Sequence, residues 1–136
     1  MYLLDTNVIS ELRKPQADAN VVSWAKGVIA PRLYISAITL KELETGVLRM
    51  ERRDPAQGKL LRSWLTRHVM PAFEARILPV DAAVALRCAS LHVPDQANES
   101  DALIAATALV HGLTVVTRNV GDFRSSGVAL INPWEH

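Results

Sequence analysis

The 136 residues of this chain are 49% hydrophobic and 21% charged, which suits one globular domain over residues 1–136 and excludes a disordered protein. The formal net charge of +1 excludes a uniformly basic surface, so any contact with nucleic acid must come from a local patch. A single cysteine, Cys88, excludes an internal disulfide and a cysteine-based zinc site, and it fits the reducing cytoplasm. We expect no membrane contact, because the longest uncharged run, 102–117, is shorter than the ~18 apolar residues of a spanning helix.

The first ten residues contain an apolar strand that ends at a carboxylate. Tyr2–Leu4 is followed at once by Asp5, Thr6 and Asn7. In a parallel α/β sheet, ligands bind at the carboxyl ends of the strands, so we expect Asp5 at that edge of the sheet. Asp5 could equally be only a cap or turn residue ahead of the helix that follows, and this stretch alone leaves both roles open.

A second strand and the helix after it bring another acid close to the core. Leu33–Ile35 is expected to be the strand and Ser36 the N-cap of the helix. Glu42 falls among apolar residues that recur at helical spacing. A carboxylate so close to a core-facing stripe points to a role beyond solvation. Glu44 lies further around the helix and is expected to be an ordinary solvated acid.

The most basic part of the chain runs from 49 to 67 and is expected to form a helical hairpin that turns at Asp54 and Pro55. Its basic side chains could contact the phosphates of RNA, or they could be the plain solvated surface that exposed charged helices usually present. The candidates for contacts with the RNA backbone are Arg49, Arg52, Arg53, Lys59 and Arg62.

A third strand and its helix follow the hairpin. We expect the strand over Ile77–Val80 and assign Asp81 the structural role of N-cap of the next helix. The apolar side of that helix is expected to consist of Val84, Ala85, Leu86, Cys88, Ala89 and Leu91.

The last third of the chain supplies the remaining acids. Asp101 lies in the first turn of a helix whose body is almost entirely small or apolar, so we expect this helix to be buried on most sides. Residues 113–117 follow as a β-branched strand of the kind found in the middle of parallel sheets. Asn119 and Asp122 come after its carboxyl end, and a last strand is expected over 128–131.

Strands and helices alternate along the chain, which predicts an α/β fold with a central parallel β-sheet of four to five short strands and helices on both faces. Such a sheet can bring its strand ends and the first turns of neighbouring helices into one crevice. Four carboxylates at short range repel one another, and a hard divalent cation such as Mg²⁺ removes that repulsion. The four histidines show no ligand spacing, which argues against zinc. The predicted cluster, Asp5, Glu42, Asp101 and Asp122, therefore indicates metal-dependent phosphate chemistry.

Four strings of the sequence resemble the PIN-domain ribonucleases of bacterial type II toxin–antitoxin modules: LLDTNVISE, SAITLKELETGV, SDALIAATALVHGLTVVTRNVGDF and INPW. Within that family the chain is similar to the VapC toxins, and most similar to the FitB-like branch. The resemblance covers essentially the whole chain. It implies a PIN fold, a Mg²⁺ or Mn²⁺ site, an RNA substrate, a homodimer and a small antitoxin partner. It leaves open a larger toxin–antitoxin assembly on operator DNA.

The resemblance also implies roles for single residues. Asp5, Glu42 and Asp101 fall on the metal-binding acids of the family, and Thr6 falls on their hydroxyl neighbour. Many members carry an Asp where this chain has Asn119, and others carry the acid three residues later. We therefore assign the fourth acidic role to Asp122 and a water- or substrate-holding role to Asn119.

These assignments give a mechanistic hypothesis for the hydrolysis of RNA phosphodiester bonds. Asp5, Asp101 and Asp122 would hold one or two divalent ions. Glu42 would bind through the waters of the metal or orient the attacking water. In-line attack would leave a 5′-phosphate and a 3′-hydroxyl.

Three other classes of protein also carry clustered acids at strand ends. A phosphatase with an aspartyl nucleophile usually carries a second Asp where this chain has Asn7, and a response-regulator receiver needs a lysine that has no counterpart here. The third is a non-catalytic module that binds RNA or an antitoxin and uses a metal only to shape its surface. Cleavage assays with and without EDTA separate this last class from a nuclease.

Overall fold

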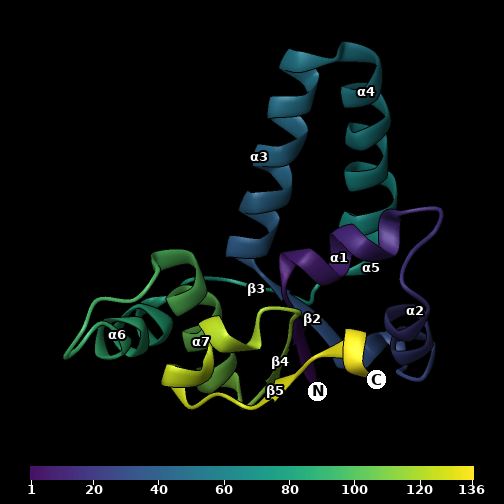
Figure 1. Ribbon diagram of the computed structural model, residues 1–136. Helices are drawn as coiled ribbons and strands as arrows, with labels where there is room; N and C mark the ends of the chain where they lie inside the picture. Colours follow the sequence, from purple (N-terminus) through teal and green to yellow (C-terminus); the bar gives the residue numbers. More distant parts are fainter.

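The computed structural model describes all 136 residues and has a five-stranded sheet in the order β3-β2-β1-β4-β5 (Figure 1). Every pair of neighbouring strands is parallel, so the predicted α/β fold is confirmed. The third and last strands are shorter than predicted, and Pro79 follows β3 directly because it has no N–H to donate to a sheet. The strands are β1 (Tyr2–Leu4), β2 (Leu33–Ser36), β3 (Ile77–Leu78), β4 (Thr114–Val116) and β5 (Leu130–Ile131).

Helices and short helical turns connect the strands. The α-helices are α1 (Thr6–Arg13), α2 (Ala19–Lys26), α3 (Ala37–Arg53), α4 (Pro55–Trp64), α5 (Met70–Ala72), α6 (Ala82–Leu91) and α7 (Glu99–His111). The shorter turns are η1 (Ala30–Arg32), η2 (Leu65–Val69, a π-helical turn), η3 (Val120–Asp122), η4 (Arg124–Ser126) and η5 (Pro133–Glu135). None of the helices combines the length and the apolarity that crossing a bilayer requires.

Side-chain caps fix where the helices begin. Ser36 and Asp81 accept hydrogen bonds from the first backbone N–H groups of α3 and α6, as predicted. Asp54 does the same for α4, which starts at the predicted turn. Asn98 caps α7 by accepting from the N–H of Asp101. The helix therefore starts two residues before Asp101, which stays in its first turn.

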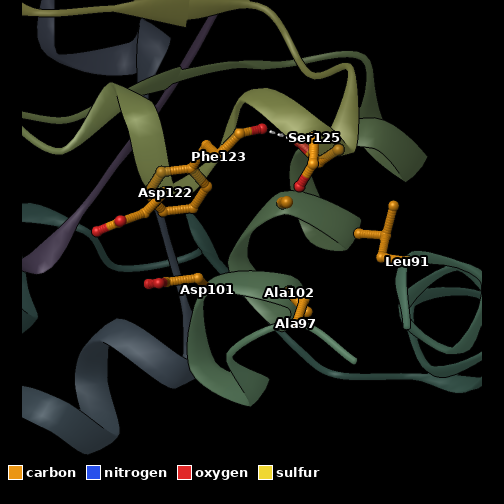
Figure 2. A pocket seen from close by; sticks show the side chains of 9 residues that line it. Leu91, Ala97, Asp101, Ala102, Asp122, Phe123 and Ser125 are labelled. Carbon is orange, nitrogen blue, oxygen red and sulfur yellow. Dashed lines mark hydrogen bonds between the residues drawn. The ribbon is translucent and has the colours of Figure 1, made fainter. Parts of the chain in front are cut away.

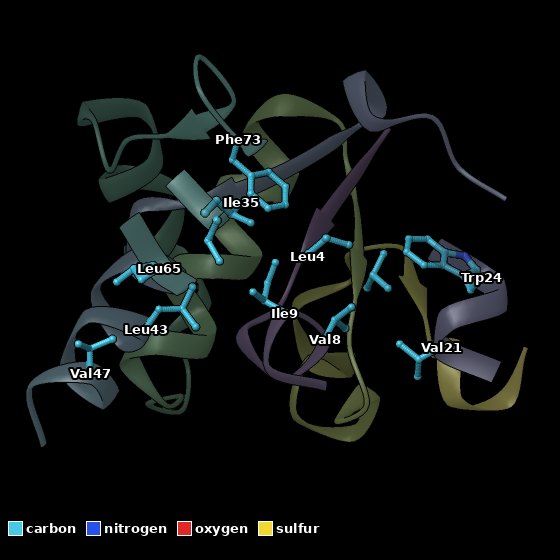
Figure 3. Packing of buried hydrophobic residues seen from close by; sticks show 12 residues of the cluster. Leu4, Val8, Ile9, Val21, Trp24, Ile35, Leu43, Val47, Leu65 and Phe73 are labelled. Atoms are coloured by element: carbon cyan, nitrogen blue, oxygen red, sulfur yellow. The ribbon is translucent and has the colours of Figure 1, made fainter. Parts of the chain in front are cut away.

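The two central strands divide their side chains between two apolar clusters. Leu3 and Val115 point to the face that α7 covers. Leu4 and Val116 point to the other face, where they pack with residues of α1, α2 and α3 (Figure 3). All four side chains are buried, and β1 and β4 therefore form the fixed centre of the molecule.

The predicted apolar side of α6 is only partly correct. Val84 and Cys88 are buried against α7, but Leu86 is 75% exposed and Ala85 and Ala89 are exposed as well. The reason is that α6 lies at the outside of the fold, where α7 covers one of its faces (Figure 1). A helix with one partner buries a narrow stripe, which composition alone does not reveal.

Helices α3 and α4 form a hairpin that extends away from the sheet (Figure 1). The helices are in close contact at Gly58, where an added Cβ would lie 2.4 Å from the Cα of Glu51. Arg62 crosses from α4 to donate to both carboxylate oxygens of Glu44, at 2.6 and 2.8 Å, and to Glu51 at 3.2 Å. The expectation that Glu44 is an ordinary solvated acid was therefore wrong. This ion pair lowers the pKa of Glu44.

Candidate active site

The candidate site begins where β1 and β4 end side by side. Leu4 and Val116 are register partners, and the N–H of Asp5 donates to the carbonyl of Val116 at 2.9 Å. The carboxylate of Asp5 then accepts from the N–H of Thr6 at 2.8 Å and caps α1. Asp5 is thus both a helix cap and a buried acid at the carboxyl edge of the sheet, with 7% of its surface exposed. The two roles that its sequence context left open coexist.

The structure brings the four predicted acids together. Burial raises the pKa of Asp101, and repulsion from Asp5, Asp122 and Glu42 raises it further, to about 6. Burial also raises the pKa of Asp5. The hydrogen bonds that Asp5 receives oppose this rise, whereas the charges of Glu42 and Asp122 add to it. The residue after β1 and residues of α3, α7 and η3, far apart along the chain, therefore bring their carboxylates close enough to repel one another, and we call this group of four acids the acidic crevice.

The chain itself supplies no cation to this crevice. Its ion pairs are Lys14 with Glu11, Arg62 with Glu44 and Glu51, and His92 with Glu99, and none of the four clustered acids takes part. An all-carboxylate set of donors with unrelieved repulsion fits a hard divalent cation. No three of these acids have donor atoms within 4.8 Å of one another, so the crevice is wider than a closed all-protein coordination sphere. Mg²⁺, which usually keeps several waters, suits that spacing.

Asp122 rather than Asn119 completes the acidic cluster. The N–H of Asp122 donates to the carbonyl of Asn119 at 3.0 Å, which turns the chain through η3. Asp101 and Asp122 border a cavity of about 20 Å³, enough for roughly one water (Figure 2). In Figure 2 their carboxylates point to the same side. Asn119 has an exposed side chain and contributes its backbone N–H to the hydroxyl of Thr117.

Two hydroxyl groups lie next to the acids, and the sequence predicts only one of them, that of Thr6. Thr6 donates from Oγ1 to Oε1 of Glu42 at 2.7 Å. Thr117 donates from Oγ1 to Oδ2 of Asp5 at 2.8 Å and is fully buried. The sequence predicts Thr117 only as the last residue of a β-branched strand. The signal that could have found it is its position, since the residue after β4 must lie beside the residue after β1 when these strands pair in parallel.

Comparison with known proteins identifies the fold. A family model described as PIN domain matches residues 2–125. The chain belongs to the PIN-domain family. It is 41% identical to Toxin FitB of Neisseria gonorrhoeae over 98% of this chain and 99% of that protein. It is 38% identical to VapC ribonuclease Y4jK of Sinorhizobium fredii over 99% of both chains.

Two solved structures resemble this PIN domain closely. The crystal structure of FitAcB from Neisseria gonorrhoeae matches with a TM-score of 0.93 and 40% identity over the full length of both chains. The structure of FitAB bound to an IR36 DNA fragment matches with a TM-score of 0.86 and 37% identity, over 98% of this chain and 96% of that one. The similarity therefore extends over the whole fold, including the sheet and the α3–α4 hairpin.

The basic candidates of the PIN domain lie at different distances from the acids. Arg49 borders a polar cavity of about 300 Å³ that also contains Glu42. Arg52 and Arg53 lie at the far end of α3, about 15 Å along the helix from Glu42 at ~1.5 Å per residue. Arg62 is occupied by its two glutamates and is not free to bind a phosphate. Of the basic residues that the sequence predicts to contact RNA, Arg49 is thus the best placed to act next to the acidic crevice.

A second cluster of potential metal ligands lies between α6 and α7. Cys88 Sγ lies 3.8 Å from His92 Nε2, which is 2.9 Å from a carboxylate oxygen of Glu99. The backbone N–H of Ala97 donates to His92 Nδ1 at 3.0 Å, so the proton of the neutral ring is on Nε2, where it is donated to Glu99. That leaves His92 no lone pair for a metal. Burial also raises the pKa of the Cys88 thiol, and the cluster is a hydrogen-bonded link between the two helices.

Proposed function

We propose that this PIN domain is the toxin of a type II toxin–antitoxin system and an endoribonuclease that hydrolyses RNA phosphodiester bonds. One observation carries the proposal: four carboxylates from distant segments face one crevice, and no cation of the chain neutralises them. The relatives named Toxin FitB and VapC ribonuclease, which match this chain over nearly its full length, support it.

We further propose Mg²⁺ or Mn²⁺ as the cofactor, because divalent metals serve PIN nucleases in general and the donor set consists of carboxylates. The residues that would hold the ion are Asp5, Glu42, Asp101 and Asp122. When bound, such an ion lowers the pKa of a water and offsets the charge that develops on the scissile phosphate. Glu42 and Asp122 are the exposed members of the set. The hydrogen bond from Thr6 fixes one oxygen of Glu42 and leaves the other free, so we assign Glu42 the role of orienting the attacking water.

RNA is proposed to bind along α3 and the edge of the crevice. The cavity of about 300 Å³ beside Glu42 has no apolar lining residue and contains Lys41, Arg49 and Ser100, which suits a phosphate next to the scissile one. Arg52 and Arg53 would contact phosphates further along the strand. At the crevice, Thr6 and Asn119 are assigned to substrate contacts.

The proposed partners are a small antitoxin, a second copy of the chain and, for the whole assembly, operator DNA. The solved FitAcB complex and the FitAB complex with a DNA fragment support this proposal, since both contain a chain that matches this one closely. We propose that the protein acts in the cytoplasm, where its unpaired Cys88 stays reduced.

The test compares purified wild-type protein with the Asp5→Asn and Asp101→Asn variants on RNA, with Mn²⁺ or Mg²⁺ and with EDTA. The wild type should cleave only with metal, and each variant should lose about 100-fold or more in rate, equivalent to ~2.7 kcal/mol of transition-state stabilisation. Asp95→Asn, an exposed acid in the loop before α7, is the matched control and should cleave normally. Unchanged cleavage by Asp5→Asn or Asp101→Asn would refute the site. RNA binding without any cleavage would instead identify a non-catalytic module.

A further inference from the structure

Thr117 occupies a central position among the polar groups that surround Asp5. The residue has no exposed surface, and it follows β4 directly. Its Oγ1 lies 2.8 Å from Asp5 Oδ2, 3.0 Å from the backbone nitrogen of Asn119 and 3.4 Å from Nδ2 of Asn7. Three segments of the chain therefore meet at one buried hydroxyl.

The partners of this hydroxyl determine where its proton points. The backbone N–H of Asn119 and the side-chain amide of Asn7 can only donate, so they use the lone pairs of Oγ1. The amide of Asn7 is held in this orientation because its Oδ1 accepts from the N–H of Arg118 at 3.4 Å. The single hydroxyl proton of Thr117 is then directed to Asp5 Oδ2.

The carboxylate of Asp5 is thus held at both oxygens. Oδ1 accepts from the N–H of Thr6 at 2.8 Å, and Oδ2 accepts from Thr117 at the same distance. Two donors fix the plane of the carboxylate, and each oxygen keeps a lone pair for another partner. Because ligand orientation by neighbouring hydrogen bonds is a large part of metal affinity, the arrangement bears directly on cation binding.

We propose that Thr117, held in place by Asn7, is a positioning residue that orients the carboxylate of Asp5 toward a divalent cation. This inference rests on the proposed metal site and adds two residues to it. A valine has nearly the same shape as threonine and would fill the same buried space, so packing alone does not require a hydroxyl here. The hydroxyl is explained by its three hydrogen bonds, and the one that it donates goes to Asp5.

The experiment measures Mn²⁺ binding to the full-length protein by calorimetry, independently of RNA cleavage. Thr117→Val should weaken Mn²⁺ binding by about 10-fold or more, the usual cost of losing such a supporting bond, whereas Thr117→Ser should bind like the wild type. In cleavage assays the Thr117→Val variant should need more Mn²⁺ for half-maximal rate and recover most of its rate at saturation. Asn7→Ala should also weaken Mn²⁺ binding and raise the Mn²⁺ concentration for half-maximal rate, but by less than Thr117→Val.

Thr107→Val is the matched control. Thr107 is also fully buried, and its hydroxyl donates to the carbonyl of Leu103 at 2.7 Å within α7, so the variant loses an equivalent buried bond without touching Asp5. Its Mn²⁺ affinity should stay unchanged. If Thr117→Val unfolds, the comparison of Asn7→Ala with Thr107→Val decides the question in its place.

The outcomes separate this inference from the proposed function. The positioning role is overturned if folded Thr117→Val binds Mn²⁺ as tightly as the wild type while Asp5→Asn loses binding. If Thr117→Val does not fold, the same result in Asn7→Ala overturns it. Equal Mn²⁺ binding by wild type and Asp5→Asn overturns the metal site itself, and the positioning role with it. A loss in Thr117→Val that Thr117→Ser does not share supports the inference.

Discussion

The acidic crevice and the α3–α4 hairpin both contain several carboxylates, but only the hairpin neutralises them within the chain. In the hairpin, Arg62 donates to Glu44 and Glu51, and the pKa of Glu44 is lowered. In the crevice no basic side chain pairs with the acids, and the pKa of Asp101 is raised to about 6. Carboxylates are thus stabilised by an arginine of the chain in the hairpin, whereas in the crevice they repel one another.

This difference separates a structural ion network from a functional one. The hairpin network is satisfied within the chain, so it needs no outside partner and stabilises the packing of two helices. The crevice keeps its charges uncompensated, which lowers the stability of the metal-free protein and favours any cation that enters. Three changes test this comparison, from the largest expected effect to the smallest.

Replacing Gly58 with Val should disrupt the packing of the hairpin and its ion network. The new Cβ would overlap the backbone of Glu51, so α3 and α4 must separate, and Arg62 would then no longer reach both glutamates. We expect a loss of about 1–3 kcal/mol in the free energy of unfolding, measured in urea. Gly46→Ala on α3 is the control: nothing lies within 4 Å of its added Cβ, and a helical Gly→Ala change should stabilise by ~0.5–1 kcal/mol. Equal stabilities of the two variants would contradict the close helix contact.

Replacing Asp101 with Asn should relieve the repulsion in the crevice. The pKa of Asp101 is raised from 3.8 to about 6, so between these values the folded state keeps a proton that the unfolded state has released. The stability of the metal-free wild type should therefore fall as the pH rises from about 4 to 6 and stay low above that.

Asp101→Asn should lack this fall and be more stable than the metal-free wild type at pH 8 by about 1 kcal/mol, allowing for solvent screening. Unfolding in urea at pH 5 and pH 8, with EDTA present, measures it. Adding Mn²⁺ should stabilise the wild type more than the variant. A wild type whose metal-free stability rises over this pH interval would argue against a repulsive crevice.

Replacing Arg62 with Ala should have the smallest effect. The ion pairs of Arg62 are partly exposed to solvent, so we expect a loss of only about 0.5–1 kcal/mol in unfolding free energy and no change in Mn²⁺ affinity. Arg67→Ala removes an exposed arginine without an ion pair and should be neutral. A change in Mn²⁺ affinity in Arg62→Ala would show that the two regions are coupled, contrary to the comparison.

The sequence by itself determined the features that depend on neighbours along the chain. Ser36 and Asp81 are predicted as helix caps, and the hairpin is predicted to turn at Asp54, because a cap bonds to N–H groups two or three residues away. The apolar run of β1 and the alternation of strands with helices were enough to predict the parallel sheet and to put Asp5 at its carboxyl edge.

The tertiary structure decided every feature that depends on which segments meet. The strand order places β4 beside β1, and only this pairing brings Thr117 and Asp122 close to Asp5. The pairing of Arg62 with Glu44 and the exposure of Leu86 were likewise missed. The physical reason is that helical and strand periodicity show which face of an element is apolar, whereas a second element, distant in the sequence, determines what that face or a charged side chain contacts.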